Sequence, residues 1–354
     1  MNLKKVLLTI IVILFCLFFS TNFTYAYDKN SFTGVVTQIL KEDENYQLLE
    51  VAIIKGEQKN ELIYVKNGGY DIADYQEYKI HDKLLISYSK DLDGNDVYLI
   101  ADYLRQDTLL TLFIIFIIVS IAITGVWGAS SLIGMGFSFL IIFKILLPLI
   151  IKGYNPVLVA VGSSMLIIPV NFYLSHGFNK KTHVAIVGTI ISLIITGFLA
   201  IIFISQSKLT GYSSEEAGFL FFEKSEINMI GILLAGIIIG TLGVLDDVTI
   251  SQSAIVFQLI SLDNKLKFKE LYLKAMKIGK DHISSMTNTL VLVYAGASMP
   301  LLLLFINNPR PISEVINYEL IAEEIIRTLI GSIGLILAIP ITTIIAVHFA
   351  LKKN

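Results

Sequence analysis

Two adjacent carboxylates, Asp246 and Asp247, lie between two apolar stretches of this chain. Hydroxyl and amide side chains follow them at Thr249, Ser251, Gln252 and Ser253. On a helix, Asp246, Thr249 and Ser253 share one face. Carboxylate and hydroxyl oxygens gathered on one face suit a hard cation or a proton path. Burying two neighbouring carboxylates without a countercharge is costly, so we expect at least one of them to bind a cation or a proton.

The same pair has a second interpretation that needs no chemistry. Residues 248–262 form another apolar run, which we interpret as a helix that dips into the membrane or packs against the bundle. In a cytoplasmic loop, Asp247 would simply cap the N-terminus of that helix. Both interpretations remain open at the level of sequence.

A second polar group opens a later apolar segment. Its members recur at the spacing of one helix face and are Asp281, Ser284, Ser285 and Asn288. His282 is adjacent to Asp281 in the sequence. A histidine titrates near neutral pH, so His282 and Asp281 would complete the first site if the two segments touch. The alternative is an interfacial helix end with ordinary interhelical hydrogen bonds.

The composition shows what must position these groups. Hydrophobic residues make up 55% of the 354 residues and charged residues only 16%, against about 25% charged in soluble domains. Residues 28–105 nevertheless hold 24 of the 56 charged residues, 9 basic and 15 acidic. This distribution excludes a single soluble domain. It predicts an α-helical polytopic membrane protein with a small extracytoplasmic β domain at residues 28–105 and a helical domain at residues 106–354.

Seven apolar segments after residue 105 are long enough to cross about 30 Å of hydrocarbon. They are roughly residues 108–123, 132–151, 156–174, 183–204, 227–245, 283–306 and 325–351. With residues 28–105 outside the cell membrane, the inner segments hold 10 lysines and the outer short loops hold 4 basic residues. This bias predicts a cytoplasmic C-terminus. Residues 265–280 are then interpreted as an amphipathic helix on the inner leaflet.

Residues 1–26 carry a basic end, an apolar core and a small residue before the expected cut, which is typical of a signal peptide. An uncleaved anchor helix is the alternative.

Residues 28–105 then alternate apolar and polar residues in five short runs, which predicts a small closed β-barrel of the OB or SH3-like kind. Residues 91–96 resemble the start of a calcium loop, but position 12 is Asp102 instead of glutamate, which favours a hairpin turn.

Several function classes have no support. Cys16 is the only cysteine, so no disulfide framework or cysteine zinc site forms within one chain. We find no dinucleotide loop, P-loop, zinc-protease motif or nucleophile elbow, and we therefore predict no catalytic residue, cofactor or metal site. Enzymatic activity is not indicated, and a net charge of −2 does not favour nucleic acid.

The polar motifs resemble a known family. Residues 243–252, with the sequence GVLDDVTISQ, are similar to the signature of the YibE/F-like membrane proteins, and residues 278–304 are similar to a second one. Residues 153–156 and 175–179 also fit. The resemblance covers about residues 105–350. It implies a multi-span architecture, and it supplies neither an established activity nor assigned catalytic residues.

The leading functional hypothesis is a transporter or permease-like protein that acts on a small solute or ion in the lipid bilayer. Proton or cation coupling would run through Asp246, Asp247, Asp281 and His282. The alternative is a non-transporting scaffold, assembly factor or envelope sensor that uses its outer β domain, with a second copy or another membrane protein as partner. Transport predicts that the two acidic groups meet around a cavity.

The predicted topology can be tested with single cysteines at Asn95, Asn307 and Lys274 after Cys16 is replaced. A membrane-impermeant thiol reagent added to intact cells should label positions 95 and 307 only. This is because the signal and the lysine bias place residues 263–282 inside. Labelling of position 274 would contradict the seven-span topology, and labelling after lysis confirms that each cysteine is reactive.

Overall fold

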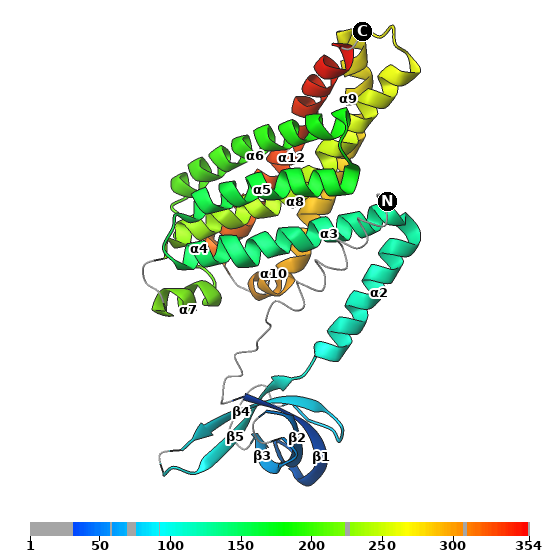
Figure 1. The fold of residues 1–354 in the computed structure, drawn as a ribbon. Helices are drawn as coiled ribbons and strands as arrows, with labels where there is room; N and C mark the ends of the chain where they lie inside the picture. Colours follow the sequence, from blue (N-terminus) through cyan, green and yellow to red (C-terminus); the bar gives the residue numbers. More distant parts are fainter. Residues whose placement is uncertain are drawn as a thin grey trace. The chain divides into compact units, whose positions relative to one another are not determined.

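The computed structural model describes residues 31–56, 59–68, 76–91, 93–223, 227–306 and 310–352. The expected signal or anchor at residues 1–26 and the test position Asn307 lie outside these residues. Contacts divide the chain into two compact units, residues 1–123 and 124–354. Each unit is described by itself, and both are drawn in Figure 1.

All five predicted strands are present. They are β1 (Ser31–Asp43), β2 (Tyr46–Lys55), β3 (Leu62–Gly68), β4 (Lys83–Lys90) and β5 (Asp96–Tyr103). They form one antiparallel sheet in the order β3-β2-β1-β4-β5. Alternate side chains of the strands are buried, which is why the period-two pattern was visible in the sequence. Their core includes Val36, Leu49, Val51, Leu84 and Ile86.

The sheet is not the closed barrel that the sequence predicted. β3 and β5 approach each other, but the described strands form no ladder between them. The segment before β4 bridges the two sides instead. The Tyr78 N–H donates to Oε1 of the buried Gln47 on β2, and the Tyr103 hydroxyl on β5 donates to the Glu77 carbonyl. The described edge strands β3 and β5 share no ladder, so the barrel stays open.

The segment that resembled a calcium loop is the turn of the β4–β5 hairpin. The Asp91 carboxylate accepts hydrogen bonds from the backbone N–H groups of Asp93 and Asn95 and from the Asn95 side-chain amide. These donors, the Asn95 amide first, hold the pKa of Asp91 below its usual range. No group of three potential metal-ligating side chains occurs among the residues that the structure describes.

Six helices are long and apolar enough to cross a membrane. They are α2 (Gln106–Thr124), the continuous run of α3 (Val126–Ile141), η1 (Ile142–Leu146) and α4 (Leu147–Ile151), then α5 (Pro156–His176), α6 (Lys180–Gln206), α8 (Met229–Leu262) and α12 (Glu319–Leu351). A seventh span is present if the bent pair α9 (Phe268–Ala297) and α10 (Met299–Ile306) counts as one. Two short helices complete the unit, α7 (Glu215–Glu223) and α11 (Ile312–Val315).

Asparagine side chains start three of the long helices. Asn155 accepts from the N–H groups of the first turn of α5, and Asn179 and Asn228 do the same for α6 and α8. Each cap satisfies N–H groups that have no carbonyl partner within the helix.

The expected amphipathic helix and the sixth span are one helix in the structure, α9. It stops at Ser298, where the chain bends by 69° into α10. Pro300 is the second residue of α10, and its ring cannot be accommodated in a continuing helix. The bend therefore falls inside the apolar segment that the sequence treats as a single span.

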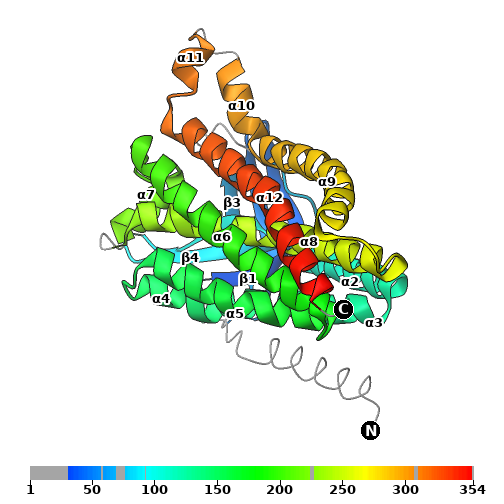
Figure 2. The ribbon, with the colours of Figure 1, turned by 90° about the horizontal axis from the view of Figure 1, so that it is seen from above.

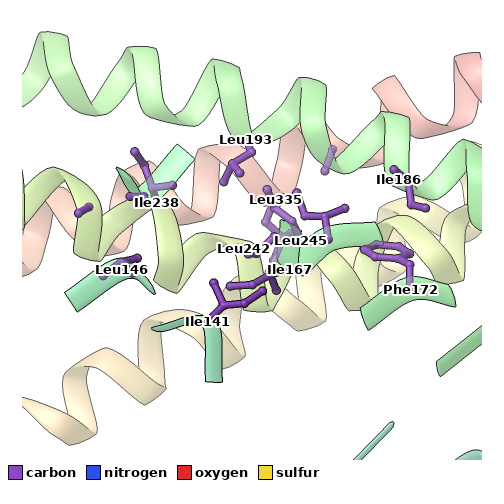
Figure 3. Packing of buried hydrophobic residues seen from close by; sticks show 14 of the residues in the cluster. Ile141, Leu146, Ile167, Phe172, Ile186, Leu193, Ile238, Leu242, Leu245 and Leu335 are labelled. Carbon is purple, nitrogen blue, oxygen red and sulfur yellow. The ribbon is translucent and has the colours of Figure 1, made fainter. Parts of the chain in front are cut away.

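The helix α8 lies at the centre of the second unit, in contact with α5, α6, α9 and α12. Figure 2 shows α6, α8 and α12 side by side. In Figure 3, Leu242 and Leu245 of α8 pack among Ile167 of α5, Leu193 of α6 and Leu335 of α12. Burial of such side chains contributes about 1.5–3 kcal/mol each in water. In a membrane, close packing takes over part of that role.

A carboxylate ties the end of α6 to the start of α12. Glu319 Oε1 accepts from the N–H groups of Thr210 and Gly211, and its carboxylate also accepts from the Thr210 hydroxyl. At the opposite end, the Ser253 hydroxyl of α8 donates to the Lys181 carbonyl in the first turn of α6, 2.8 Å away. The bundle is thus closed by hydrogen bonds at both ends.

The β domain provides a pH-dependent test. Asp91→Asn in residues 28–105, expressed alone, should lower the melting temperature at pH 7, because the amide nitrogen that replaces one carboxylate oxygen cannot accept from the Asn95 side-chain amide. Since the folded-state pKa of Asp91 is lowered, its stabilisation is present above about pH 4 and is lost as the pH falls further. The difference from wild type, followed by circular dichroism at 218 nm, should therefore shrink towards pH 3.

Asp93→Asn is the matched control, because the described structure gives the Asp93 side chain no hydrogen bond. A pH-independent effect of Asp91→Asn would contradict the capping role of the carboxylate. A disordered spectrum would show that residues 28–105 do not fold alone. Calcium should not change the melting temperature, since the turn itself occupies the Asp91 oxygens.

Candidate functional site

Asp246 and Asp247 lie in the interior of one uninterrupted helix, α8. The interpretation of Asp247 as the N-cap of a separate helix over residues 248–262 is therefore wrong. A cap residue has non-helical backbone angles, and no such break occurs here. The physical reason is that aspartate in a helix interior loses only a few tenths of a kcal/mol relative to better helix formers, which the packing of α8 outweighs. Residues 248–262 are the second half of the same helix, which confirms the interpretation as a segment packed against the bundle.

The two carboxylates point to different surroundings. Asp246 is half-buried, and its Oδ2 accepts a hydrogen bond from the Asn171 side-chain amide of α5. A Cβ on Gly134 of α3 would come within 2.3 Å of the Asn171 Oδ1, so the glycine makes room for this asparagine. The other carboxylate oxygen, Asp246 Oδ1, is buried and has no hydrogen-bond partner among the described residues. Gly134 of α3 thus makes room for the α5 asparagine that binds one oxygen of the Asp246 carboxylate on α8.

One turn further along α8, the buried Thr249 contacts α6. Its hydroxyl lies 2.7 Å from the Thr189 hydroxyl and 3.3 Å from the Asp246 carbonyl oxygen. Each hydroxyl has one proton, so Thr189 donates to Thr249 when Thr249 donates to the carbonyl. The pair forms a short hydrogen-bonded row that ends on the backbone carbonyl of Asp246.

Gln252 connects α8 to two other helices. Its side-chain nitrogen donates to the Ala275 carbonyl of α9 at 3.2 Å and to the Thr343 hydroxyl of α12 at 2.8 Å. A Cβ on Gly279 would lie 3.0 Å from Gln252 Oε1 and 2.7 Å from an Ile339 methyl, so glycine permits this close approach. Gln252 Oε1 itself is buried without a partner in the described structure.

The remaining members of the first group lie nearer the surface of the bundle. Asp247 is exposed and Ser251 is half-buried, whereas Ser253 is buried and bonded to α6. Asp247 and Lys181 lie near His176, the last residue of α5. Asp247 therefore belongs to a polar rim near the lysine-rich end of the bundle, in contrast to its enclosed neighbour.

A family model described as "YibE/F-like protein" matches residues 112–352. The chain belongs to the YibE/F-like family. The matched segment contains every candidate site residue named above and leaves out the sheet. No curated protein and no solved structure matches the chain.

In this YibE/F-like chain the second polar group does not join the first. Asp281, Ser284, Ser285 and Asn288 are exposed on α9, and His282 is half-buried. The helix α9 packs on the bundle through other side chains, among them Ile283, Met286 and Leu290. Within the described residues, no hydrogen bond or ion pair links this group to Asp246–Ser253. The structure thus brings Asp246, Thr249, Gln252 and Ser253 into the interior and leaves Asp281 and Asn288 outside it.

Asp246 does not lie in either of the two hollows that the structure shows most clearly. One, of about 550 Å³, is formed by residues of β4, β5 and the start of α2. The other, of about 570 Å³, lies where α6 ends and α8 begins.

Sequence reasoning did not identify Asn171, Thr189, Gly134 or Thr343 as parts of this site. The signal for Asn171 was available, because a lone side-chain amide within an apolar span requires a polar partner. The signal for Gly134 was not, since only the positions of neighbouring helices show which glycine faces a polar side chain.

The Asn171–Asp246 hydrogen bond predicts a coupling between these positions. Asn171→Ala should destabilise the purified protein by about 1–3 kcal/mol, because it leaves both Asp246 oxygens without a partner. Asp246→Ala in that background should cost much less than in the wild type, since the unpaired carboxylate is removed. Thermal unfolding of the four proteins in detergent measures this double-mutant cycle. Additive effects of the two substitutions would show that the pair does not interact.

Proposed function

We propose that this YibE/F-like protein is a transporter-type membrane protein whose transport step is linked to a proton or a small cation at Asp246. One observation carries the proposal: an enclosed carboxylate that has one oxygen bonded to Asn171 and the other without a partner. No basic side chain forms an ion pair with it among the described residues. An enclosed carboxylate without countercharge must take up a proton or bind a cation. Exchange of that ion is the elementary step of coupled transport.

The depth of Asp246 supports a role within the membrane. Met229 is the first residue of α8, and Asp246 follows it about 26 Å further along the helix axis. Ser253, about 10 Å beyond Asp246, reaches the first turn of α6. The carboxylate thus precedes the polar end of the bundle by about two helical turns. An ionisable group at such a depth costs free energy and usually marks a functional site. A structural role alone is therefore a poor explanation.

The neighbours of Asp246 suggest a division of roles. Asn171 fixes one oxygen and leaves Oδ1 to receive the ion. The hydroxyls of Thr249 and Thr189 supply further oxygens that can accept or relay a proton. His176, a half-buried titratable group, is the last residue of α5, towards the lysine-rich end of the bundle. We assign the entry of the ion to that side.

We further propose seven crossings of the cell membrane, with α9 and α10 as a single bent span. The first turn of α6, the segment before α9 and the end of α12 then lie on the cytoplasmic side, where Lys180, Lys267 and Lys352 favour that orientation. The opposite end carries the acidic Glu215, Glu319 and Glu323. Residues 28–105 would be extracytoplasmic.

The proposal is tested with dicyclohexylcarbodiimide, an apolar reagent that modifies protonated carboxyl groups in membranes. In the full-length protein in liposomes, peptide mass spectrometry should find Asp246 modified, and more rapidly as the pH falls. A coupling cation should slow the modification, so the reaction is repeated in sodium, potassium and lithium salts. Absence of modification across the pH range in all three salts would overturn the proposal.

A growth-complementation experiment compares substitutions of two neighbouring carboxylates, Asp246 and Asp247. In a deletion strain with a growth phenotype, Asp246→Asn should fail to complement at a normal protein level in the membrane. Asp247→Asn is the matched control, because it removes an exposed carboxylate one residue away. Full complementation by Asp246→Asn would exclude this carboxylate as the coupling site and would favour the non-transporting alternative.

A further inference from the structure

The helix α9 has two different faces. One face packs on the bundle and includes Leu271, Ala275, Gly279 and Leu290. The opposite face is exposed and follows an alternating spacing of three and four residues along the helix. Its members are Ile278, Asp281, Ser285, Asn288 and Leu292. This face, which we call the α9 stripe, has the 3.5-residue period of a two-helix seam.

The α9 stripe runs deep into the membrane. Gly279 packs against Gln252, and the next residue of α8, Ser253, is bonded to the first turn of α6. That contact marks the polar end of the bundle. Asn288 lies nine residues beyond Gly279, about 13 Å along the helix, against a hydrocarbon half-thickness of about 15 Å. If the membrane boundary lies near Gly279, Asn288 is close to the bilayer centre.

The polar side chains of the stripe need partners that the bundle does not provide. In the part of the chain that the structure describes, the side chains of Asp281, Ser285 and Asn288 make no hydrogen bond. An amide offers two donors and one acceptor, and leaving them in hydrocarbon costs several kcal/mol. A lipid tail cannot satisfy these groups, so another protein surface must cover the stripe.

We propose that the partner is a second copy of this chain, and that two α9 helices pair in parallel along the stripe. Copies inserted in the same orientation relate by a two-fold axis along the membrane normal, which brings equal positions together. Asn288 is suited to this, because each amide can donate to the other and accept from it. Ser285 is small enough for close approach of two backbones.

Charge complementarity at the end of the stripe favours the same partner. Lys277 and Lys280 are exposed within four residues of Asp281 on the same helix. In a parallel pair along this seam, Lys277 flanks the seam whereas Lys280 points away from it. Lys277 of each copy therefore lies next to the Asp281 of the other copy and offsets the repulsion of the two carboxylates. An apolar helix lacks these groups. The apolar stretch of α2, from Leu109 to Ile123, for example, contains only Thr111 and Ser120 as polar residues.

Disulfide cross-linking of full-length protein in native membranes tests the pairing. Cys16 is replaced, and single cysteines are placed at each position from 284 to 293. Copper phenanthroline should give covalent dimers at Ser285, Asn288 and Leu292, with minima between them. The exposed Val293 is the control at equal depth, because it lies off the stripe. Co-expression of two differently tagged copies shows that the dimer contains two chains.

A uniform yield along residues 284–293, or no dimer at any position, would overturn the proposal. Disulfides to cysteines placed in α2 of the same chain would overturn it as well, since α2 would then cover the stripe. In purified protein, Asn288→Val should raise the dimer dissociation constant roughly ten-fold, measured by subunit-exchange fluorescence in detergent. Thr289→Val is the matched control, because the Thr289 hydroxyl bonds to the Ser285 carbonyl of its own helix. Equal effects of both substitutions would contradict a specific role of Asn288.

Discussion

A polar side chain between packed apolar helices can find hydrogen-bond partners only within the protein, and α8 carries four such side chains within eight residues. Asp246 bonds to α5, Thr249 and Ser253 bond to α6, and Gln252 bonds to α9 and α12. Apolar packing is not directional, so it leaves the rotation and depth of a helix loosely defined. These directed bonds define both for α8, and the neighbouring helices are positioned around it.

Close approach of the helices makes these bonds possible, and small residues permit it. A Cβ at Gly134, Gly188 or Gly334 would come within 2.3 Å of a polar side-chain atom on a neighbouring helix. The atoms concerned belong to Asn171, Thr342 and Thr196, so each glycine faces a hydroxyl or amide and not a lipid. In a membrane bundle, small residues at helix contacts bring backbones together and let polar groups reach across. The glycines and the polar side chains therefore work as one set.

The sequence predicted the elements of this fold better than their connections. The five strands and the YibE/F-like family are confirmed, because strand alternation and the motifs around Asp246 and Asp281 are local signals. The prediction of a closed barrel was wrong, because closure depends on hydrogen bonds between the edge strands β3 and β5, which form no ladder in the described structure. The break proposed at Asp247 was wrong as well, because tertiary packing outweighs the weak helix propensity of aspartate.

The candidate site shows the same limit in a different form. The helical spacing of Asp246, Thr249 and Ser253 was visible from their numbers alone. Which helix each side chain meets was not, because Asn171 and Thr343 lie 75 and 91 residues away from their partners. The separation of Asp281 from Asp246 could not be predicted either, since it depends on which face of α9 turns towards the bundle.

The Glu319 clamp on Thr210 and Gly211 has a consequence for the biogenesis of the protein. Thr210 and Gly211 precede Glu319 by 109 and 108 residues in the chain, and Gln252 precedes its partner Thr343 by 91 residues. Ribosomes deliver α6 and α8 to the membrane long before α12 emerges. During that interval the Gln252 amide lacks its bond to Thr343, and the segment at Thr210 and Gly211 lacks its bonds to Glu319. The helix α12 thus completes the hydrogen bonds of the bundle. A chain truncated before α12 would keep unsatisfied polar groups in its centre, and quality-control machinery could recognise them.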